Sequence, residues 1–168
     1  MIMKISLTGL RPGSYEFQFD EPPAKWGLEN HPHLRALVRL TVELAKGTTS
    51  IDVRNHIRTM GHFICDRCLA EFDLLLEDSG RVVFSSHTDL MMPGEEVFRV
   101  YDPHAHEIDL SEDIRDLLLL SIPAKVLCQE DCRGLCRKCG ANLNVEPCRC
   151  TATHADLRWQ PLQKLLNQ

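Results

Sequence analysis

The sequence lacks long hydrophobic runs and any recognisable targeting segment. Its longest uninterrupted apolar stretch covers only residues 117–120, far short of the roughly 20 residues that a membrane-spanning helix needs. Residues 1–6 show neither the apolar segment of a secretory signal nor the Arg- and Ser-rich composition of a transit peptide. We therefore expect a cytoplasmic protein that has no membrane partner and keeps its thiols reduced.

Patterns that indicate catalysis are also missing. We can assign no pairing of a nucleophile with a base and no glycine-rich loop that could cradle a phosphate. Internal repeats and low-complexity tracts are absent as well. We predict that the protein is not an enzyme and takes no small-molecule substrate.

Apolar and polar residues alternate over much of the N-terminal half, a pattern typical of half-buried strands. Residues 34–46 indicate the first strand of a hairpin that turns at 47–49, with a helix as the alternative. The other predicted strands cover residues 3–7, 15–19, 51–57, 71–85 with a bend at 78–80, and 97–101.

A helix is predicted at residues 110–121, where apolar side chains recur at helical spacing. Asp109 and Glu112 would form an acidic capping box at its start, and Pro123 would end it. A second, short helix is predicted at residues 161–167.

The eight cysteines are the most informative feature of the sequence, because all of them fall into close pairs. Two thiolates so near in the chain can bind one ion, and a tetrahedral zinc site needs two such pairs. Structural zinc returns about 10–16 kcal/mol per site, enough to order a polar segment such as 128–150. We therefore expect two Zn²⁺ ions per chain, with iron as the alternative metal. The pairs are Cys65/Cys68, Cys128/Cys132, Cys136/Cys139 and Cys148/Cys150.

Two groupings of these pairs into sites are possible, and their spacing favours the first only modestly. The first grouping joins Cys65 and Cys68 to Cys128 and Cys132, and it leaves a local site of Cys136, Cys139, Cys148 and Cys150. The second grouping joins the four cysteines from 128 to 139 and leaves 65 and 68 with 148 and 150.

These patterns together predict an α+β fold. We expect an antiparallel β-rich body with one main helix at residues 1–127, and a zinc-stapled segment at residues 128–168 that ends in the short helix. The two parts would pack as a single unit.

Charge is spread unevenly along the chain. Residues 1–132 contain 13 basic and 22 acidic side chains, whereas residues 133–168 contain 6 basic and 2 acidic ones. This asymmetry suggests that the C-terminal end meets something acidic. Zinc bound by four thiolates has a net charge of −2 and would offset part of the positive charge.

The two cysteine blocks resemble the YceD family, small bacterial and plastid proteins linked to accumulation of large-subunit ribosomal RNA. The resemblance rests on Cys65-Asp66-Arg67-Cys68-Leu69, on residues 134–144 (GLCRKCGANLN) and on Cys148-Arg149-Cys150. It covers roughly residues 35–168 and favours the first grouping of the cysteines. One departure is Asp156-Leu157-Arg158, where the family often has Asp-Pro-Arg.

The resemblance implies a zinc-binding protein that assists large ribosomal subunit biogenesis and accumulation of 23S rRNA. Its partner would be ribosomal RNA or a large-subunit ribosomal protein. The candidate contact residues for RNA phosphate or for that protein are Arg133, Arg137, Lys138, Arg149 and Arg158.

Two other functions stay open. The acidic body could dock a partner outside the ribosome, which would make the chain a protein-interaction module. Zinc thiolates can also be oxidised with release of the metal, which would make it a redox switch.

Overall fold

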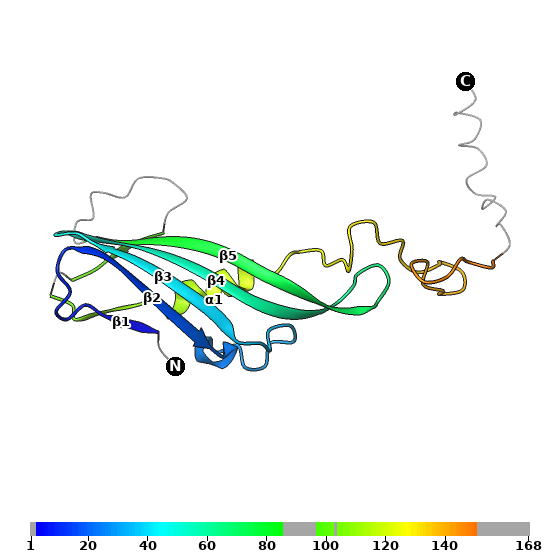
Figure 1. The fold of residues 1–168 in the computed structure, drawn as a ribbon, viewed down its shortest axis with the longest axis horizontal. Helices are drawn as coiled ribbons and strands as arrows, with labels where there is room; N and C mark the ends of the chain where they lie inside the picture. Colours follow the sequence, from blue (N-terminus) through cyan, green and yellow to red (C-terminus); the bar gives the residue numbers. More distant parts are fainter. Residues whose placement is uncertain (1–2, 86–96, 103, 151–168) are drawn as a thin grey trace, which may run out of the picture.

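The computed structural model describes residues 3–85, 97–102 and 104–150. Five strands form one sheet in the order β2-β3-β4-β5-β6, and β1 pairs separately with β7. Figure 1 shows an elongated molecule in which the sheet occupies one end and residues 128–150 extend from the other. In chain order the elements are β1 (Lys4–Ser6), β2 (Gly13–Glu21), the 3-10 helix η1 (Pro23–Trp26), β3 (Val38–Lys46), β4 (Ser50–Ile64), β5 (Glu71–Ser85), β6 (Val97–Val100), β7 (Glu107–Asp109) and α1 (Ser111–Leu120).

Side-chain alternation explains why residues 38–46 form a strand and not the alternative helix. Val38, Leu40, Val42 and Leu44 are buried and their neighbours are more exposed, which is the two-residue period of a strand with one buried face. The prediction of a hairpin is confirmed, since β3 pairs with β4 in antiparallel register around residues 47–49.

Two predictions about the sheet are wrong. The expected bend at 78–80 is absent, because β5 pairs with β4 without interruption from Glu71 to Ser85; pairing along a long partner strand overrides the local turn signal of Ser79-Gly80. The sheet is also not wholly antiparallel, since β6 runs parallel to β5 at its edge.

The core lies between one face of the sheet and a layer made of β1, β7, η1 and α1 (Figure 1). The helix is confirmed within one residue at each end, and its buried face consists of Ile114, Leu117 and Leu118. Its predicted capping box is wrong. The first residue before the helix is Leu110, and the Asp109 carboxylate accepts a hydrogen bond from the Ser111 N–H instead.

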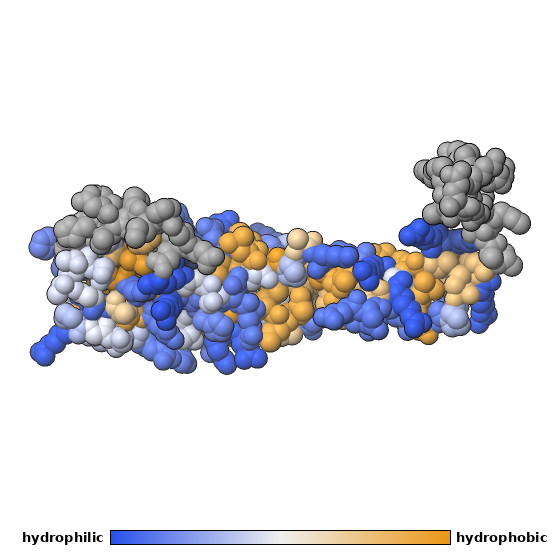
Figure 2. All heavy atoms as spheres, turned by 90° about the horizontal axis from the view of Figure 1, so that it is seen from above, coloured by the Kyte–Doolittle hydropathy of each residue, from blue (hydrophilic) through white to orange (hydrophobic). Residues whose placement is uncertain are grey.

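Strands β4 and β5 extend beyond the rest of the sheet as a two-stranded arm. Pairing of β4 with β3 ends at Arg58, whereas its pairing with β5 continues to Ile64. The arm ends in residues 65–70, which we call the hairpin tip. Figure 1 shows the tip close to the chain that follows α1, and Figure 2 shows the molecule narrowing toward this end.

Among the described residues, no helix is long and apolar enough to cross a membrane. The predicted helix at 161–167 lies outside the described residues, so it remains a prediction.

Candidate metal centres

The structure brings the cysteine sulfurs together in two sets of four. Within each set the sulfur atoms lie within 4.8 Å of one another. We call the first set cluster 1 and the second cluster 2; they contain the same cysteines as the first grouping above, and the second grouping is not the one found. Cluster 1 is Cys65, Cys68, Cys128 and Cys132, and cluster 2 is Cys136, Cys139, Cys148 and Cys150.

Cluster 1 joins the hairpin tip to the segment that follows α1. The Sγ atoms of Cys65 and Cys132 are 3.8 Å apart, and those of Cys68 and Cys128 are 3.6 Å apart. Three of the four cysteines are buried, among the apolar side chains of Ala70, Phe72, Leu127 and Leu135. The cluster is therefore mostly buried, and it links residues 60 positions apart in the sequence.

The two residues between Cys65 and Cys68 hold the same segment by hydrogen bonds. The Asp66 N–H donates to the Val126 carbonyl at 2.9 Å, and the Val126 N–H donates back to the Asp66 carboxylate at 2.7 Å. The Arg67 guanidinium donates to the Cys132 carbonyl at 2.9 Å, and the Arg67 carbonyl accepts from the Leu135 N–H at 3.1 Å. These four hydrogen bonds hold the hairpin tip against the segment that follows α1.

Cluster 2 is built within one short loop. The Cys136 N–H donates to the Ala141 carbonyl, and the Gly140 N–H returns to the Cys136 carbonyl at 2.9 Å. Gly140 has a φ of +74°, a conformation that glycine adopts without the strain a side chain would bring. Cys139 is exposed and the other three cysteines are half-buried, so solvent reaches this cluster.

The spacing of the sulfurs fits a tetrahedral thiolate site. Zinc–sulfur bonds of about 2.3 Å place the sulfurs of a tetrahedron about 3.8 Å apart. The Cys65–Cys132 and Cys139–Cys148 distances are both 3.8 Å, and Cys136–Cys148 is shorter at 3.2 Å. Both clusters could therefore hold a metal ion.

Two thiols of cluster 1 have pKa values shifted in opposite directions. Burial favours the neutral thiol of Cys65, but hydrogen bonds from the backbone N–H groups of Cys128, Arg67 and Cys68 outweigh it and lower the pKa of Cys65 to about 6. Burial, together with thiol hydrogen bonds to Cys68 and Cys65, raises the pKa of Cys128 to about 12.

Two thiols of cluster 2 also have pKa values shifted in opposite directions. Hydrogen bonds from the backbone N–H groups of Cys139 and Lys138 lower the pKa of Cys136 to about 6. Thiol hydrogen bonds with Cys139 and Cys148 raise the pKa of Cys150 to about 12. Each cluster therefore contains one thiol that is more acidic than usual and one that is less acidic, and a divalent cation bound there would displace thiol protons.

Four of the five predicted contact residues are described, and all four are exposed in or beside cluster 2. They are Arg133, Arg137, Lys138 and Arg149. Arg158 lies outside the described residues.

Sequence reasoning missed three residues that shape these centres. Asp66 and Arg67 lie inside the first cysteine motif, and Asn144 lies in the loop that closes cluster 2. Asn144 Nδ2 is 3.2 Å from the Cys132 sulfur. The only available signal was their position within or near the cysteine motifs, since polar residues there can donate to sulfur or bind backbone.

Comparison with known proteins identifies a family that matches this chain. The family model described as "Large ribosomal RNA subunit accumulation protein YceD" matches residues 53–166, a range that includes all eight cysteines. No solved structure matches the chain.

Three relatives illustrate the range of the similarity. A Mycobacterium tuberculosis protein is 30% identical over 172 residues, which cover 99% of this chain and 81% of the relative. The chloroplastic YCED homolog 1 of Arabidopsis thaliana is 43% identical over 68 residues, 40% of this chain and 21% of that protein. The chloroplastic YCED homolog 1 of Zea mays is 31% identical over 147 residues, 71% of this chain and 50% of that protein.

The chain thus spans half or less of the two plant proteins and most of the mycobacterial one. The names of the two plant relatives describe large ribosomal RNA subunit accumulation proteins. The family model covers more than half of the chain and both cysteine clusters, which confirms the resemblance found in the motifs. The chain belongs to the YceD family.

Proposed function

We propose that this protein binds two zinc ions and supports accumulation of the large-subunit ribosomal RNA, by contacting that RNA or a ribosomal protein. The observation that carries the proposal is the pair of four-sulfur clusters inside the region that matches the family. The family and its plant members are named for large ribosomal RNA subunit accumulation.

The donor set fits a structural zinc ion. Four thiolates in tetrahedral spacing form a closed site, whereas catalytic zinc keeps an open position for water or substrate. A closed site supports a structural role for the metal. It also supports our expectation that the protein is not an enzyme.

The exposed basic side chains around cluster 2 are the proposed contact surface for RNA phosphate. Arg137 and Lys138 lie between two cysteines of that cluster, on a turn that metal would make rigid. Lys and Arg side chains that meet phosphate release counterions from the RNA, so binding weakens as salt rises.

Metal content and RNA binding test the proposal in turn. Elemental analysis of the reduced, purified protein should find about two zinc ions per chain. Affinity for large-subunit RNA should then fall steeply with salt. R137E/K138E should reduce both the affinity and the salt slope, the slope by about 1 for each phosphate that the variant no longer neutralises.

A matched control is R11E/R35E, which changes the net charge by the same amount at exposed residues of the body. It should leave RNA binding nearly unchanged. Equal losses of RNA affinity in the two double variants would mean that net charge alone explains the effect. Failure of both RNA and ribosomal proteins to co-purify with the protein would contradict the proposal.

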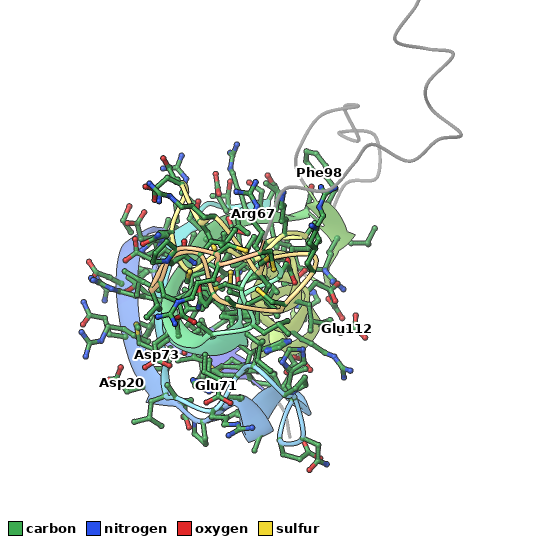
Figure 3. The ribbon with its side chains drawn as sticks, turned by 90° about the vertical axis from the view of Figure 1, so that its right-hand side faces the viewer. Asp20, Arg67, Glu71, Asp73, Phe98 and Glu112 are labelled. Atoms are coloured by element: carbon green, nitrogen blue, oxygen red, sulfur yellow. The ribbon has the colours of Figure 1, made fainter. Side chains whose placement is uncertain are left out.

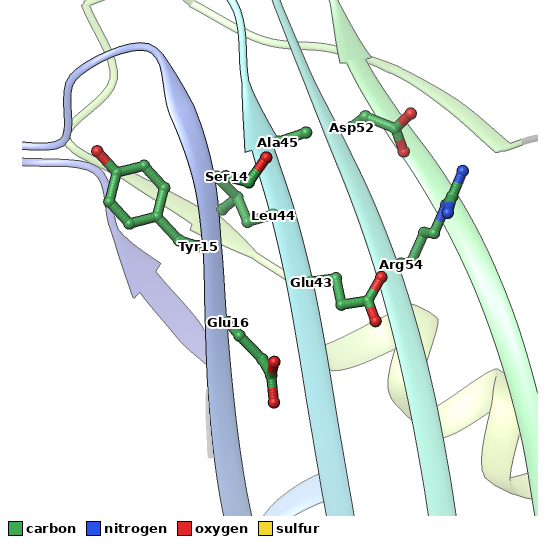
Figure 4. Close-up of a pocket in the computed structure, with 8 residues that line it drawn as sticks. All are labelled: Ser14, Tyr15, Glu16, Glu43, Leu44, Ala45, Asp52 and Arg54. Carbon is green, nitrogen blue, oxygen red and sulfur yellow. The ribbon is translucent and has the colours of Figure 1, made fainter.

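A protein partner for the body is the second candidate, supported by an acidic depression on the outer face of the sheet. The depression has a volume of about 490 Å³ and crosses β2, β3 and β4 (Figure 4). Glu16 and Glu43 lie directly opposite each other there, with Asp52 nearby. Like charges so placed destabilise a sheet. Arg54, opposite Glu43, and Arg81, which pairs with Asp52, offset part of this repulsion, and a cationic peptide would offset more of it.

The depression lies on the sheet, whereas the proposed RNA contact lies in and beside cluster 2, toward the other end of the molecule (Figure 1). In the end-on view of Figure 3, Asp20, Glu71 and Asp73 of the body project to one side of the molecule, and Arg67 of the hairpin tip projects to another. Binding that survives R137E/K138E and ribonuclease but is lost with E16K/E43K would favour this second candidate.

A further inference from the structure

Asn144 belongs to the loop of cluster 2 but contacts a cysteine of cluster 1. It lies between Cys139 and Cys148, in the loop that closes cluster 2. Its side-chain Nδ2 is 3.2 Å from the sulfur of Cys132, which belongs to cluster 1. Asn144 itself is exposed, whereas Cys132 is only 3% exposed.

The neighbours of Asn144 determine which way its amide points. The Arg133 N–H can only donate, and it lies 2.8 Å from Asn144 Oδ1. The nitrogen must therefore face the Cys132 sulfur, which can accept a hydrogen bond from it. Asn142 Oδ1, 3.0 Å from the same nitrogen, accepts its second hydrogen.

The position of Asn144 depends on the loop of cluster 2. The Asn144 N–H also donates to Asn142 Oδ1 at 3.0 Å, and the Leu143 N–H donates to the Gly134 carbonyl at 2.9 Å. Leu135 and Asn142 form a β-bridge across the base of the loop. Because Cys139 and Cys148 flank this loop, metal in cluster 2 would hold its two ends together.

A second connection runs from the base of the loop to the hairpin tip. Gly134 has a φ of +73°, and a Cβ at this position would lie 3.0 Å from the Arg67 carbonyl oxygen. The same carbonyl accepts a hydrogen bond from the N–H of Leu135, the residue that follows Gly134. The loop of cluster 2 is thus packed against the turn that supplies half of cluster 1.

We infer that Asn144 is a positioning residue for the metal of cluster 1, so that binding at the two clusters is coupled. This inference rests on the proposed function, because it requires that both clusters bind metal. An N–H donor withdraws charge from a ligating thiolate and fixes its orientation. Metal in cluster 2 orders the loop that supplies this donor, and by reciprocity metal in cluster 1 favours the same ordered loop.

The test uses protein loaded with ¹¹³Cd, whose two tetrathiolate sites can be followed separately by NMR. N144A removes the donor and N144D removes it while keeping an oxygen for the Arg133 N–H. Both should shift the resonance of cluster 1 and weaken its metal affinity about 10-fold, the lower end of what loss of such an outer partner costs. V145A is the matched control, since this neighbour is 82% exposed and should change neither.

Coupling between the clusters is measured by removing cluster 2 from the native protein and from the N144A variant. C136S/C139S should speed release of metal from cluster 1 about 10-fold in the native background and much less in N144A, because the donor is already absent there.

An unchanged cluster 1 resonance and affinity in both Asn144 variants, or an equal effect of C136S/C139S in both backgrounds, would overturn the inference. Either result leaves the proposed function intact if the unsubstituted protein binds two metal ions. A chain that binds no metal would contradict the proposed function itself.

Discussion

The two clusters each contain four cysteines but connect very different parts of the chain. Cluster 1 joins residues 60 positions apart and is mostly buried. In cluster 2 the linked residues are 9 and 12 positions apart, and Cys139 is exposed. A set of four thiols can therefore connect one segment to a distant arm or lie within a single loop, depending on how much chain separates the cysteine pairs.

The largest expected effect separates the clusters by their contribution to global stability. A cross-link that closes a loop of about 60 residues lowers the entropy of the unfolded chain and so stabilises the fold by about 4 kcal/mol. A cross-link that closes a short loop stabilises it less. C65S should lose one metal ion and lower the free energy of unfolding by about that amount. C139S should also lose one ion but leave unfolding of the sheet nearly unchanged.

Denaturant unfolding followed by circular dichroism, with metal content measured in parallel, tests this difference. Equal losses of stability in C65S and C139S would mean that cluster 1 does not act as a long-range staple.

The next effect concerns the ease of metal removal. Because the surroundings of a site control its access to solvent, a chelator should strip cluster 2 at least about 10-fold faster than cluster 1. Release of zinc to a chromophoric chelator should then show two phases, and C65S, which removes cluster 1, should eliminate the slow one. Loss of the fast phase in C65S, with the slow phase intact, would reverse the assignment.

The smallest effect distinguishes two glycines with nearly the same backbone conformation. Gly134 and Gly140 have φ values of +73° and +74°, but only Gly134 faces a close neighbour, the Arg67 carbonyl. G140A should cost about 1 kcal/mol of conformational strain. G134A should cost that strain plus the displacement of the hairpin tip, and only G134A should speed metal release from cluster 1.

Chelator kinetics and unfolding of the two glycine variants measure the difference between them. Identical behaviour would show that packing of the loop against the hairpin tip contributes nothing to cluster 1.

Much of the fold follows from local sequence patterns. The alternation of Val38, Leu40, Val42 and Leu44 reports a strand because one face of the sheet is buried. The helix at residues 111–120 follows from its apolar spacing in the same way. Such signals are local, so the sequence is enough to recognise them.

The features that sequence reasoning missed depend on distant partners. Ser79-Gly80 resembles a turn, but His56 and Asn55 of β4 pair with these two residues and keep β5 continuous. The hydrogen bond from Asn144 to Cys132 is equally invisible, because nothing in the sequence indicates that this loop lies beside the other cluster.

The sequence by itself determined the chemistry of this protein: eight thiols in four close pairs, and the YceD family that they identify. Only the tertiary structure decided which pairs share a site. Spacing reveals which thiols are neighbours along the chain, whereas the partner of Cys65 and Cys68 depends on a long β4–β5 arm that carries its tip to the segment after α1. Distances between segments so far apart are set by the packing of the whole fold and are not encoded in any local pattern.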